Sequence, residues 1–281
     1  MMQNSLMPQK NGALKTLKQY NGKRMRSFIF NISYWVITIF YGIAIYLLGM
    51  FKSAEISRKL AVSYAKSMSW AMRHIAGIEF EFRGIENLPK DEPYIIASKH
   101  QSWGDGYMIM GLLGDLAIVV GDHVEAYPLM KQVLQNIGAI VVAEKVTKSS
   151  TIRIKEAFKI AHCEGRNVLI YPEGNLVKIG ERIRYRSGIY NLQQASGWKV
   201  VPVATNLGLF WSCRDIKKER GTAINEFLKP IPAGLSKNEF MEILENQLNE
   251  SSKTLCEEGQ KTHPHLSQAD VEWPLAINSN K

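Results

Sequence analysis

The sequence of 281 residues contains few cysteines, and they are widely spaced: Cys163, Cys213 and Cys256. Their number is odd and they form no C-x-x-C pair, which argues against both a disulfide framework and a zinc site built on paired cysteines. The histidines likewise show no spacing that is typical of metal ligands. We therefore expect the active domain to work in a reducing compartment and to need no metal or other cofactor.

Acidic residues are missing from residues 1–26, and residues 27–51 contain no charged residue at all. The first of these segments is basic, with Lys10, Lys15, Lys18, Lys23, Arg24 and Arg26. As a helix, the second would be roughly 37 Å long, more than the ~30 Å hydrocarbon core of a bilayer. It is also longer than the apolar part of a cleaved signal peptide. We predict a basic arm over residues 1–26 and membrane-associated helices over residues 27–76, with a buried core helix as the alternative.

The charge distribution leaves two membrane arrangements open. Basic residues also follow the apolar run, so the positive-inside rule gives no orientation. Residues 54–78 show apolar side chains at three- and four-residue spacing, which is typical of an amphipathic helix. The two helices would either enter and leave one leaflet together, or the first would span the bilayer alone. The net charge of +9 indicates an anionic partner in either case.

Residues 77–257 have the pattern of an α/β domain. Alternating residues at 78–83 predict a half-exposed strand, and apolar runs recur at 94–97, 116–120, 139–143, 168–171 and 200–204. Helical patterns occupy residues 150–163 and 236–257. Strands that alternate with helices predict a mainly parallel or mixed sheet covered by helices on both faces. Residues 258–281 lack a period, and we predict a loose C-terminal tail there.

A histidine and an aspartate follow the strand predicted at residues 94–97. Ligands of open α/β sheets bind at the carboxyl ends of the strands, which is where His100 and Asp105 stand. An imidazole can take a proton from a hydroxyl near neutral pH, and a carboxylate can fix its tautomer and stabilise the imidazolium. The pair therefore indicates a general base with its partner, if the turn between them leads into a helix. The alternative is a pair that only caps that helix.

A second polar turn ends the run at residues 168–171. Pro172 stops the strand, and Gly174 permits a close approach of the backbone. Glu173 is then expected at the same sheet edge as His100. It would either contact a substrate or bond backbone amides as a structural carboxylate.

Together these segments resemble the lysophosphatidate acyltransferase family over about residues 78–257. The family's H-x-x-x-x-D block matches His100 and Asp105, and its F-P-E-G-T-R block matches residues 171–174. Its V-P-V-A block matches residues 201–204, and its G-x-I-F-I-D-R block is similar to residues 138–145. Four blocks in the family's order are far more specific than one short pattern.

The sequence departs from the family where a phosphate is usually bound. Asn175 and Leu176 stand where the family has threonine and arginine, so the usual phosphate-binding arginine is missing. Arg186 is the natural substitute, and three neighbours offer further contacts, namely Lys178, Arg182 and Arg184. A guanidinium suits a phosphate because it can bind two oxygens at once. Glu144 and Lys145 are shifted relative to the family's D-R pair and receive no role.

The resemblance implies acyl transfer from acyl-CoA or acyl carrier protein to the free hydroxyl of lysophosphatidate, which gives phosphatidate. It implies catalytic roles for His100 and Asp105, and substrate binding by Glu173, Gly174, Arg186, Lys178 and Arg184. It also implies the bacterial inner membrane, with the active domain facing the cytoplasm and no nucleic acid as partner. A lyso-ornithine lipid or glycerol 3-phosphate remains an alternative acceptor. A membrane-anchored lipid hydrolase or a non-catalytic lipid-binding protein remains an alternative function. No G-x-S-x-G sequence occurs, which agrees with direct transfer.

Overall fold

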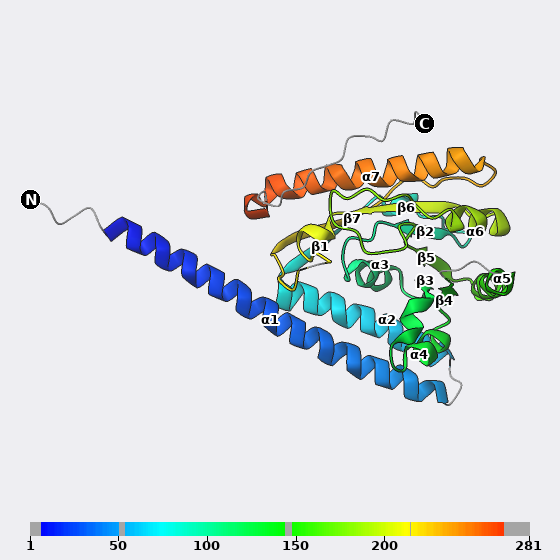
Figure 1. The fold of residues 1–281 in the computed structure, drawn as a ribbon, viewed down its shortest axis with the longest axis horizontal. Helices are drawn as coiled ribbons and strands as arrows, with labels where there is room; N and C mark the ends of the chain where they lie inside the picture. Colours follow the sequence, from blue (N-terminus) through cyan, green and yellow to red (C-terminus); the bar gives the residue numbers. More distant parts are fainter. Residues whose placement is uncertain (1–6, 51–53, 144–147, 214, 267–281) are drawn as a thin grey trace, which may run out of the picture.

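The computed structural model describes residues 7–50, 54–143, 148–213 and 215–266, and these form a sheet between two layers of helices (Figure 1). The seven strands run in the order β1-β7-β6-β2-β5-β3-β4. Their bounds are β1 Ile78–Arg83, β2 Ile95–Ser98, β3 Leu116–Gly121, β4 Ile140–Val142, β5 Asn167–Ile170, β6 Val200–Thr205 and β7 Gly221–Phe227. The helices are α1 Met7–Met50, α2 Ala54–Ala71, α3 Asp105–Leu113, α4 Met130–Asn136, α5 Lys148–Cys163, α6 Gly188–Ser196 and α7 Lys237–Thr262.

Alternate residues of the central strands face the two helical layers. Ile95 and Ala97 of β2 belong to the core shared with α5, α6 and α7, whereas Ile96 belongs to the core shared with α2 and α3. Figure 1 shows the same division, with α7 on one side of the sheet and α2 and α1 on the other. Strands that are buried on both faces read as continuous apolar runs. The predicted α/β fold with a sheet covered on both faces is therefore confirmed.

One strand was not expected from the sequence. β7 pairs in parallel with β1 and antiparallel with β6, which makes the sheet mixed. Its sequence includes Thr222, Asn225 and Glu226, and asparagine and glutamate are depleted in strands. Pairing along both edges stabilises the segment despite this composition. Asn206 contributes as well, because its side-chain oxygen accepts a hydrogen bond from the backbone amide of Ile224 at 2.8 Å.

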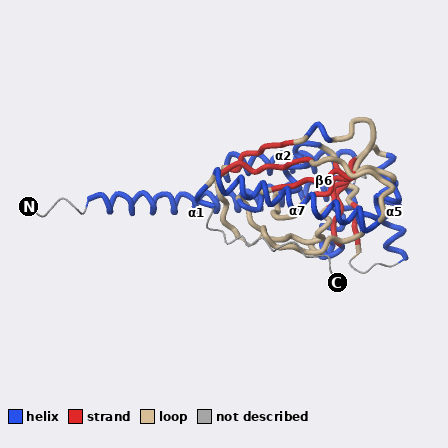
Figure 2. Tube along the Cα trace, turned by 90° about the horizontal axis from the view of Figure 1, so that it is seen from above, coloured by secondary structure: helices blue, strands red, loops and turns tan. Residues whose placement is uncertain are grey.

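The predicted basic arm and the apolar run belong to one helix. α1 begins at Met7, so residue 26 is no structural boundary. Residues 22–49 of this helix are long and apolar enough to cross a membrane, and few of the residues in that stretch are buried. Figure 2 shows the N-terminal part of α1 projecting beyond the α/β domain. The second predicted helix is α2, which ends earlier than expected in a π-helical turn at Met72–Ala76.

α1 is fastened to the α/β domain at two places. Near its C-terminal end, the amide of Asn136 in α4 donates to the carbonyl of Ile45 at 2.9 Å. Nearer its N-terminal end, the backbone amide of Lys218 donates to the Ser27 hydroxyl at 2.9 Å, and the Lys218 ammonium donates to Asn31 Oδ1 at 3.1 Å. α1 also packs along α2 between these points. The apolar half of the helix therefore lies along the domain and does not extend away from it.

The Lys218 ammonium is buried at this junction, and burial lowers its pKa to about 8. Lysine in an unfolded chain has a pKa of about 10.4. Between these values the unfolded chain binds a proton that the folded protein does not, so this residue makes folding more favourable as the pH rises. We expect Lys218→Met to remove that contribution. Unfolding of both proteins at pH 7.5 and 9.5, followed by circular dichroism, measures the difference.

Lys217→Met provides the matched control, because Lys217 is the exposed neighbour of Lys218. Its pH dependence should equal that of the unsubstituted protein. Equal pH dependence in all three proteins would contradict a buried, titrating Lys218.

The prediction of a loose tail from residue 258 is wrong for its first residues. α7 continues to Thr262, and a 3₁₀ turn follows at Pro264–Leu266. Glu258 forms two hydrogen bonds with the Arg83 guanidinium, at 2.6 and 2.8 Å, and Leu266 is buried. These tertiary contacts hold a segment whose sequence shows no helical period. Residues 267–281 lie outside the described part of the chain.

Candidate active site

Strand register brings the two polar turns together. β2 and β5 are parallel neighbours, with Ala97 opposite Ile170. Three residues beyond this pair, in the turns that follow the two strands, the same register sets His100 opposite Glu173. The backbone amide of His100 donates to Glu173 Oε2 at 2.7 Å. The prediction that both residues lie at one sheet edge is confirmed.

The turn after β2 folds Asp105 back onto the His100 ring. Asp105 is the first residue of α3, and its Oδ2 lies 3.2 Å from His100 Nδ1. The same oxygen accepts hydrogen bonds from the backbone amides of Gln101 and Ser102, each at 2.8 Å. The carboxylate therefore orders the turn that precedes α3 and faces the imidazole. It does not cap α3, whose N-cap residue is Gly104 without a side-chain hydrogen bond, so the alternative of a pair that only caps the helix does not describe the structure. Asp105 is only 1% exposed, and burial raises its pKa although the His100 ring and the two amides oppose the shift.

The Tyr171 ring packs against one face of the His100 imidazole. Its ring stacks on His100 with the centroids 3.9 Å apart and the planes at 17°. Burial raises the pKa of Tyr171 well above its ordinary value, and the negative charge of Asp105 adds to the shift. The phenol thus stays neutral. The His100 side chain is 22% exposed, and no described residue hydrogen-bonds its Nε2. That nitrogen is available to a substrate hydroxyl.

A buried ion pair links the turn that follows β2 to the turn that follows β5. Lys99 and Glu173 pair through Nζ and Oε1, with side chains 6% and 0% exposed. The ammonium also donates to the Tyr185 hydroxyl at 3.3 Å and to Asn249 Oδ1 at 3.2 Å. Burial raises the pKa of Glu173, while the charge of Lys99 opposes the shift. Since both carboxylate oxygens are engaged, the contacts of Glu173 are those of the structural carboxylate, not of a substrate-binding group.

Gly174 lets the Arg186 side chain cross the turn after β5. Its backbone has a φ of +71°, and a Cβ atom there would lie 2.4 Å from Arg186 Nε. The backbone amide of Arg186 donates to the carbonyl of Pro172 at 2.8 Å, which fixes this end of the loop against the turn. The Arg186 side chain is exposed and has no ion-pair partner among the described residues. It can therefore meet an anion beside the His100–Asp105 pair.

The other predicted basic residues differ in their availability. The amide of Val177 donates to the carbonyl of His100 at 2.8 Å, and the exposed Lys178 is the next residue after this contact with the turn that follows β2. Arg184 is exposed in the same loop. Arg182 is paired with Glu250 at 2.7 Å and is the least available of the three.

Sequence reasoning missed several residues that build the site. Lys99 directly precedes His100, and Tyr171 occupies the first position of the segment that matches the F-P-E-G-T-R block. The register of the two strands could therefore have indicated both residues. Asn249 lies on α7, and nothing in the sequence connects it with the edge. Trp103, between His100 and Asp105, is 55% exposed. Glu144 and Lys145 lie outside the described residues. Among the described residues, no group of three or more His, Cys, Asp or Glu side chains is placed to hold a metal ion.

Comparison with known proteins agrees with this site. The family model described as Acyltransferase matches residues 79–206. A 1-acyl-sn-glycerol-3-phosphate acyltransferase from Pseudomonas aeruginosa is 28% identical over 165 residues, which are 59% of this chain and 64% of the relative. The 1-acyl-sn-glycerol-3-phosphate acyltransferase alpha of Ovis aries is 24% identical and aligned over 66% of each chain. The chain thus spans just under two thirds of the length of these relatives.

The fold also has a counterpart among solved structures. The 1-acyl-sn-glycerophosphate acyltransferase PlsC from Thermotoga maritima superimposes with a TM-score of 0.64 at 17% identity, covering 83% of this chain and 97% of that one. The residues that the family model matches include the turn with His100 and Asp105 and the turn after β5. The family model over residues 79–206 and the named relatives make the α/β domain similar to the acyltransferases, and the solved structure shares its fold.

Proposed function

We propose that the protein transfers an acyl chain from acyl-CoA or acyl carrier protein to the free hydroxyl of lysophosphatidate. The observation that carries this proposal is the His100–Asp105 pair, with its partly exposed ring fixed at Nδ1 and stacked on Tyr171. The names of the relatives support the choice of acceptor. Both substrates are ones that the family's chemistry requires, and no cofactor takes part.

The proposed reaction needs one base and no covalent enzyme intermediate. His100 Nε2 takes the proton of the acceptor hydroxyl, and the oxygen attacks the thioester carbonyl. When the tetrahedral intermediate collapses, the carbon–sulfur bond breaks and the imidazolium returns its proton to the departing thiolate. Asp105 holds the ring through Nδ1 and stabilises the imidazolium between these steps.

Arg186 is the proposed phosphate ligand, and Lys178 and Arg184 add positive charge around it. The support is the position of the guanidinium over Gly174, beside the catalytic turn, with no described carboxylate to neutralise it. Hydrogen bonds to charged groups contribute about 1.5–3 kcal/mol each. We therefore expect Arg186→Ala to raise the KM for lysophosphatidate by about 10- to 100-fold, since about 1.4 kcal/mol corresponds to a factor of ten. Steady-state kinetics with a fixed acyl donor measures this change.

Arg182→Ala is the matched control for that variant. Arg182 belongs to the same loop but already pairs with Glu250, so its loss should change the KM little. A KM for lysophosphatidate that stays the same in Arg186→Ala and rises in Arg182→Ala would move the phosphate site to the other arginine.

We further propose that α1 lies in one leaflet of the bacterial inner membrane, with the active domain on its cytoplasmic side. The exposed apolar face of α1 supports membrane association. Its attachment at Ile45 and at Ser27 supports the one-leaflet arrangement, because a helix that is held along the domain cannot cross the bilayer without drawing the domain in. The basic residues that flank the apolar stretch suit an anionic surface.

An acylation assay of the purified full-length protein tests the proposed reaction. Acyl-CoA and acyl carrier protein donors would each be offered with lysophosphatidate, glycerol 3-phosphate and a lyso-ornithine lipid. Phosphatidate is the expected product. Transfer only to an acceptor without phosphate would contradict the substrate class, and release of free fatty acid without an acceptor would favour a hydrolase.

A further inference from the structure

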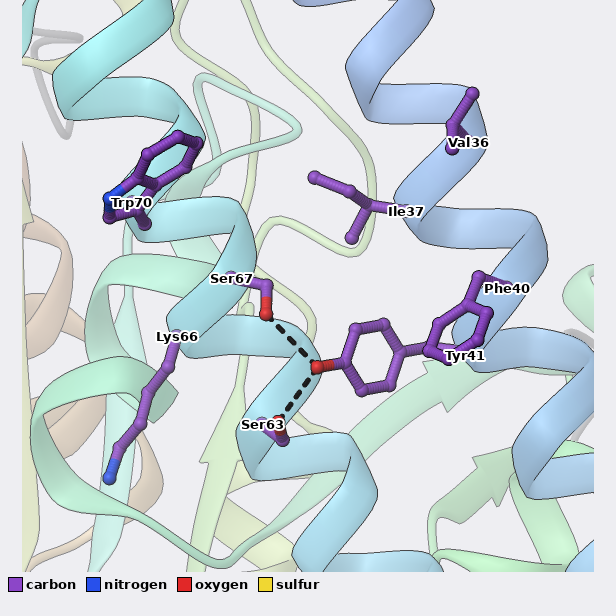
Figure 3. Close-up of a pocket in the computed structure, with 8 residues that line it drawn as sticks. All are labelled: Val36, Ile37, Phe40, Tyr41, Ser63, Lys66, Ser67 and Trp70. Atoms are coloured by element: carbon purple, nitrogen blue, oxygen red, sulfur yellow. Dashed lines mark hydrogen bonds between the residues drawn. The ribbon is translucent and has the colours of Figure 1, made fainter.

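A groove separates α1 from α2 on the side of the helix pair away from the sheet (Figure 3). It has a volume of about 660 Å³ and is lined from α1 by Val36, Ile37, Phe40 and Tyr41, and from α2 by Ser63, Lys66, Ser67 and Trp70. Its two walls differ in character. The α1 wall is mainly apolar, whereas α2 contributes two hydroxyls and an ammonium group.

The hydroxyls within the groove are already satisfied. Tyr41 extends from α1 across to α2, where its hydroxyl lies 2.7 Å from Ser63 Oγ and 3.0 Å from Ser67 Oγ, as Figure 3 shows. The tyrosine therefore closes the bottom of the groove and ties the helices together. Above this layer the exposed side chains of Val36, Phe40 and Trp70 remain uncovered, at 62%, 64% and 56% exposure.

Lys66 supplies a charge that nothing in the described protein neutralises. It is exposed at the groove, no carboxylate lines the groove, and no described acidic residue lies within ion-pair distance of it. Lys59, two turns earlier on the same helix, pairs with Glu55 at 2.6 Å. An unpaired ammonium among apolar side chains fits a ligand with an acidic head and a hydrocarbon chain.

From this geometry we infer a second lipid site. The α1–α2 groove binds an anionic phospholipid of the bilayer, with the phosphate on Lys66 and one acyl chain against Val36, Phe40 and Trp70. The inference rests on the proposed membrane position of α1, and it assigns a ligand to a surface that takes no part in acyl transfer.

The groove is connected to the catalytic helix through three tyrosines. The rings of Tyr41 and Tyr64 are 5.6 Å apart at their centroids, and those of Tyr64 and Tyr107 are 5.2 Å apart. The hydroxyls of Tyr64 and Tyr107 are hydrogen-bonded at 2.8 Å. Tyr107 is two residues after Asp105 on α3. A lipid in the groove thus contacts one end of a packed chain whose other end is next to the catalytic aspartate.

Fluorescence quenching by brominated lipids tests the site. The full-length protein would be placed in vesicles in which only phosphatidylglycerol, or only phosphatidylcholine, is brominated, at equal total bromine. Differences from Trp70→Phe and Trp35→Phe give the signals of the two tryptophans. We expect brominated phosphatidylglycerol to quench Trp70 at least threefold more than brominated phosphatidylcholine, and Lys66→Gln to remove that preference. Lys59→Gln, which removes an equal charge from the same helix face, should leave the preference intact.

Trp35 separates the two proposals, because it is exposed on α1 and does not line the groove. Quenching of Trp35 by both lipids, with no lipid preference at Trp70, overturns the lipid site and leaves the membrane position standing. Equal loss of preference in Lys66→Gln and Lys59→Gln also overturns it, because the attraction is then only that of a basic surface. An unquenched Trp35 overturns the membrane position and the lipid site with it. The His100→Ala variant should keep the preference at Trp70, since the groove lies outside the acylation site.

Discussion

Replacing His100 by alanine is expected to lower kcat for acyl transfer by about 10³-fold, within the ~10²–10⁴ that general base catalysis contributes. The loss arises because Nε2 is the basic atom at the edge, and the remaining site can only position the two substrates. Asp105→Asn is expected to cost about 10²-fold, because the ring loses the carboxylate that fixes its tautomer while the Gln101 and Ser102 amides keep an oxygen acceptor. Single-turnover assays with lysophosphatidate separate these losses from binding.

His162→Ala is a suitable control for the catalytic variant. His162 is exposed on α5, and its ring lies tilted against Trp198, away from the sheet edge, so acyl transfer should be unchanged. The His100 side chain is partly exposed and is not part of the core, and its replacement should leave the unfolding transition in place. Acyl transfer that persists in a folded His100→Ala protein would exclude the histidine as base.

The edge of the sheet could be predicted because parallel strands align their carboxyl ends. Two apolar runs that each end in a polar turn are enough to place His100 and Glu173 side by side, and the register of β2 and β5 does so. The interpretation of His100 and Asp105 as a pair required a turn that leads into a helix, and α3 begins at Asp105 as required. The His100–Asp105 contact depends on short-range geometry, and the His100–Glu173 contact follows from the alignment of two neighbouring parallel strands.

Contacts between distant elements could not be predicted in this way. Asn249 reaches Lys99 from a helix 150 residues further along the chain, and Lys218 meets Asn31 across 187 residues. Neither pair has a local pattern, because hydrophobic periodicity identifies the buried face of a helix but not its neighbour. The strand β7 was missed for the same reason, since its pairing on both sides outweighs its own composition.

Breaking the buried Lys99–Glu173 ion pair is expected to lower the stability of the folded protein substantially. Removal of one partner from a buried ion pair leaves an uncompensated charge, which typically costs about 3–5 kcal/mol. Glu173→Gln keeps an oxygen for the His100 amide but leaves the Lys99 ammonium without its counter-charge. We therefore expect its unfolding midpoint to fall by roughly 10 °C, at about 2–4 °C per kcal/mol for a protein of this size. Thermal unfolding in detergent, followed by circular dichroism, measures the shift.

Lys99→Met combined with Glu173→Gln should recover most of that loss. With both charges gone, the methionine fills the space of the lysine stem, and the Tyr185 hydroxyl still donates to Asn249 Oδ1 at 3.1 Å. A hydrophobic replacement of a buried pair is often neutral. The amide oxygen of the glutamine introduced by Glu173→Gln would still accept from the His100 backbone, so acyl transfer should recover with the fold. If the double variant is as unstable as Glu173→Gln alone, the cost comes from the lost carboxylate and not from an unpaired lysine.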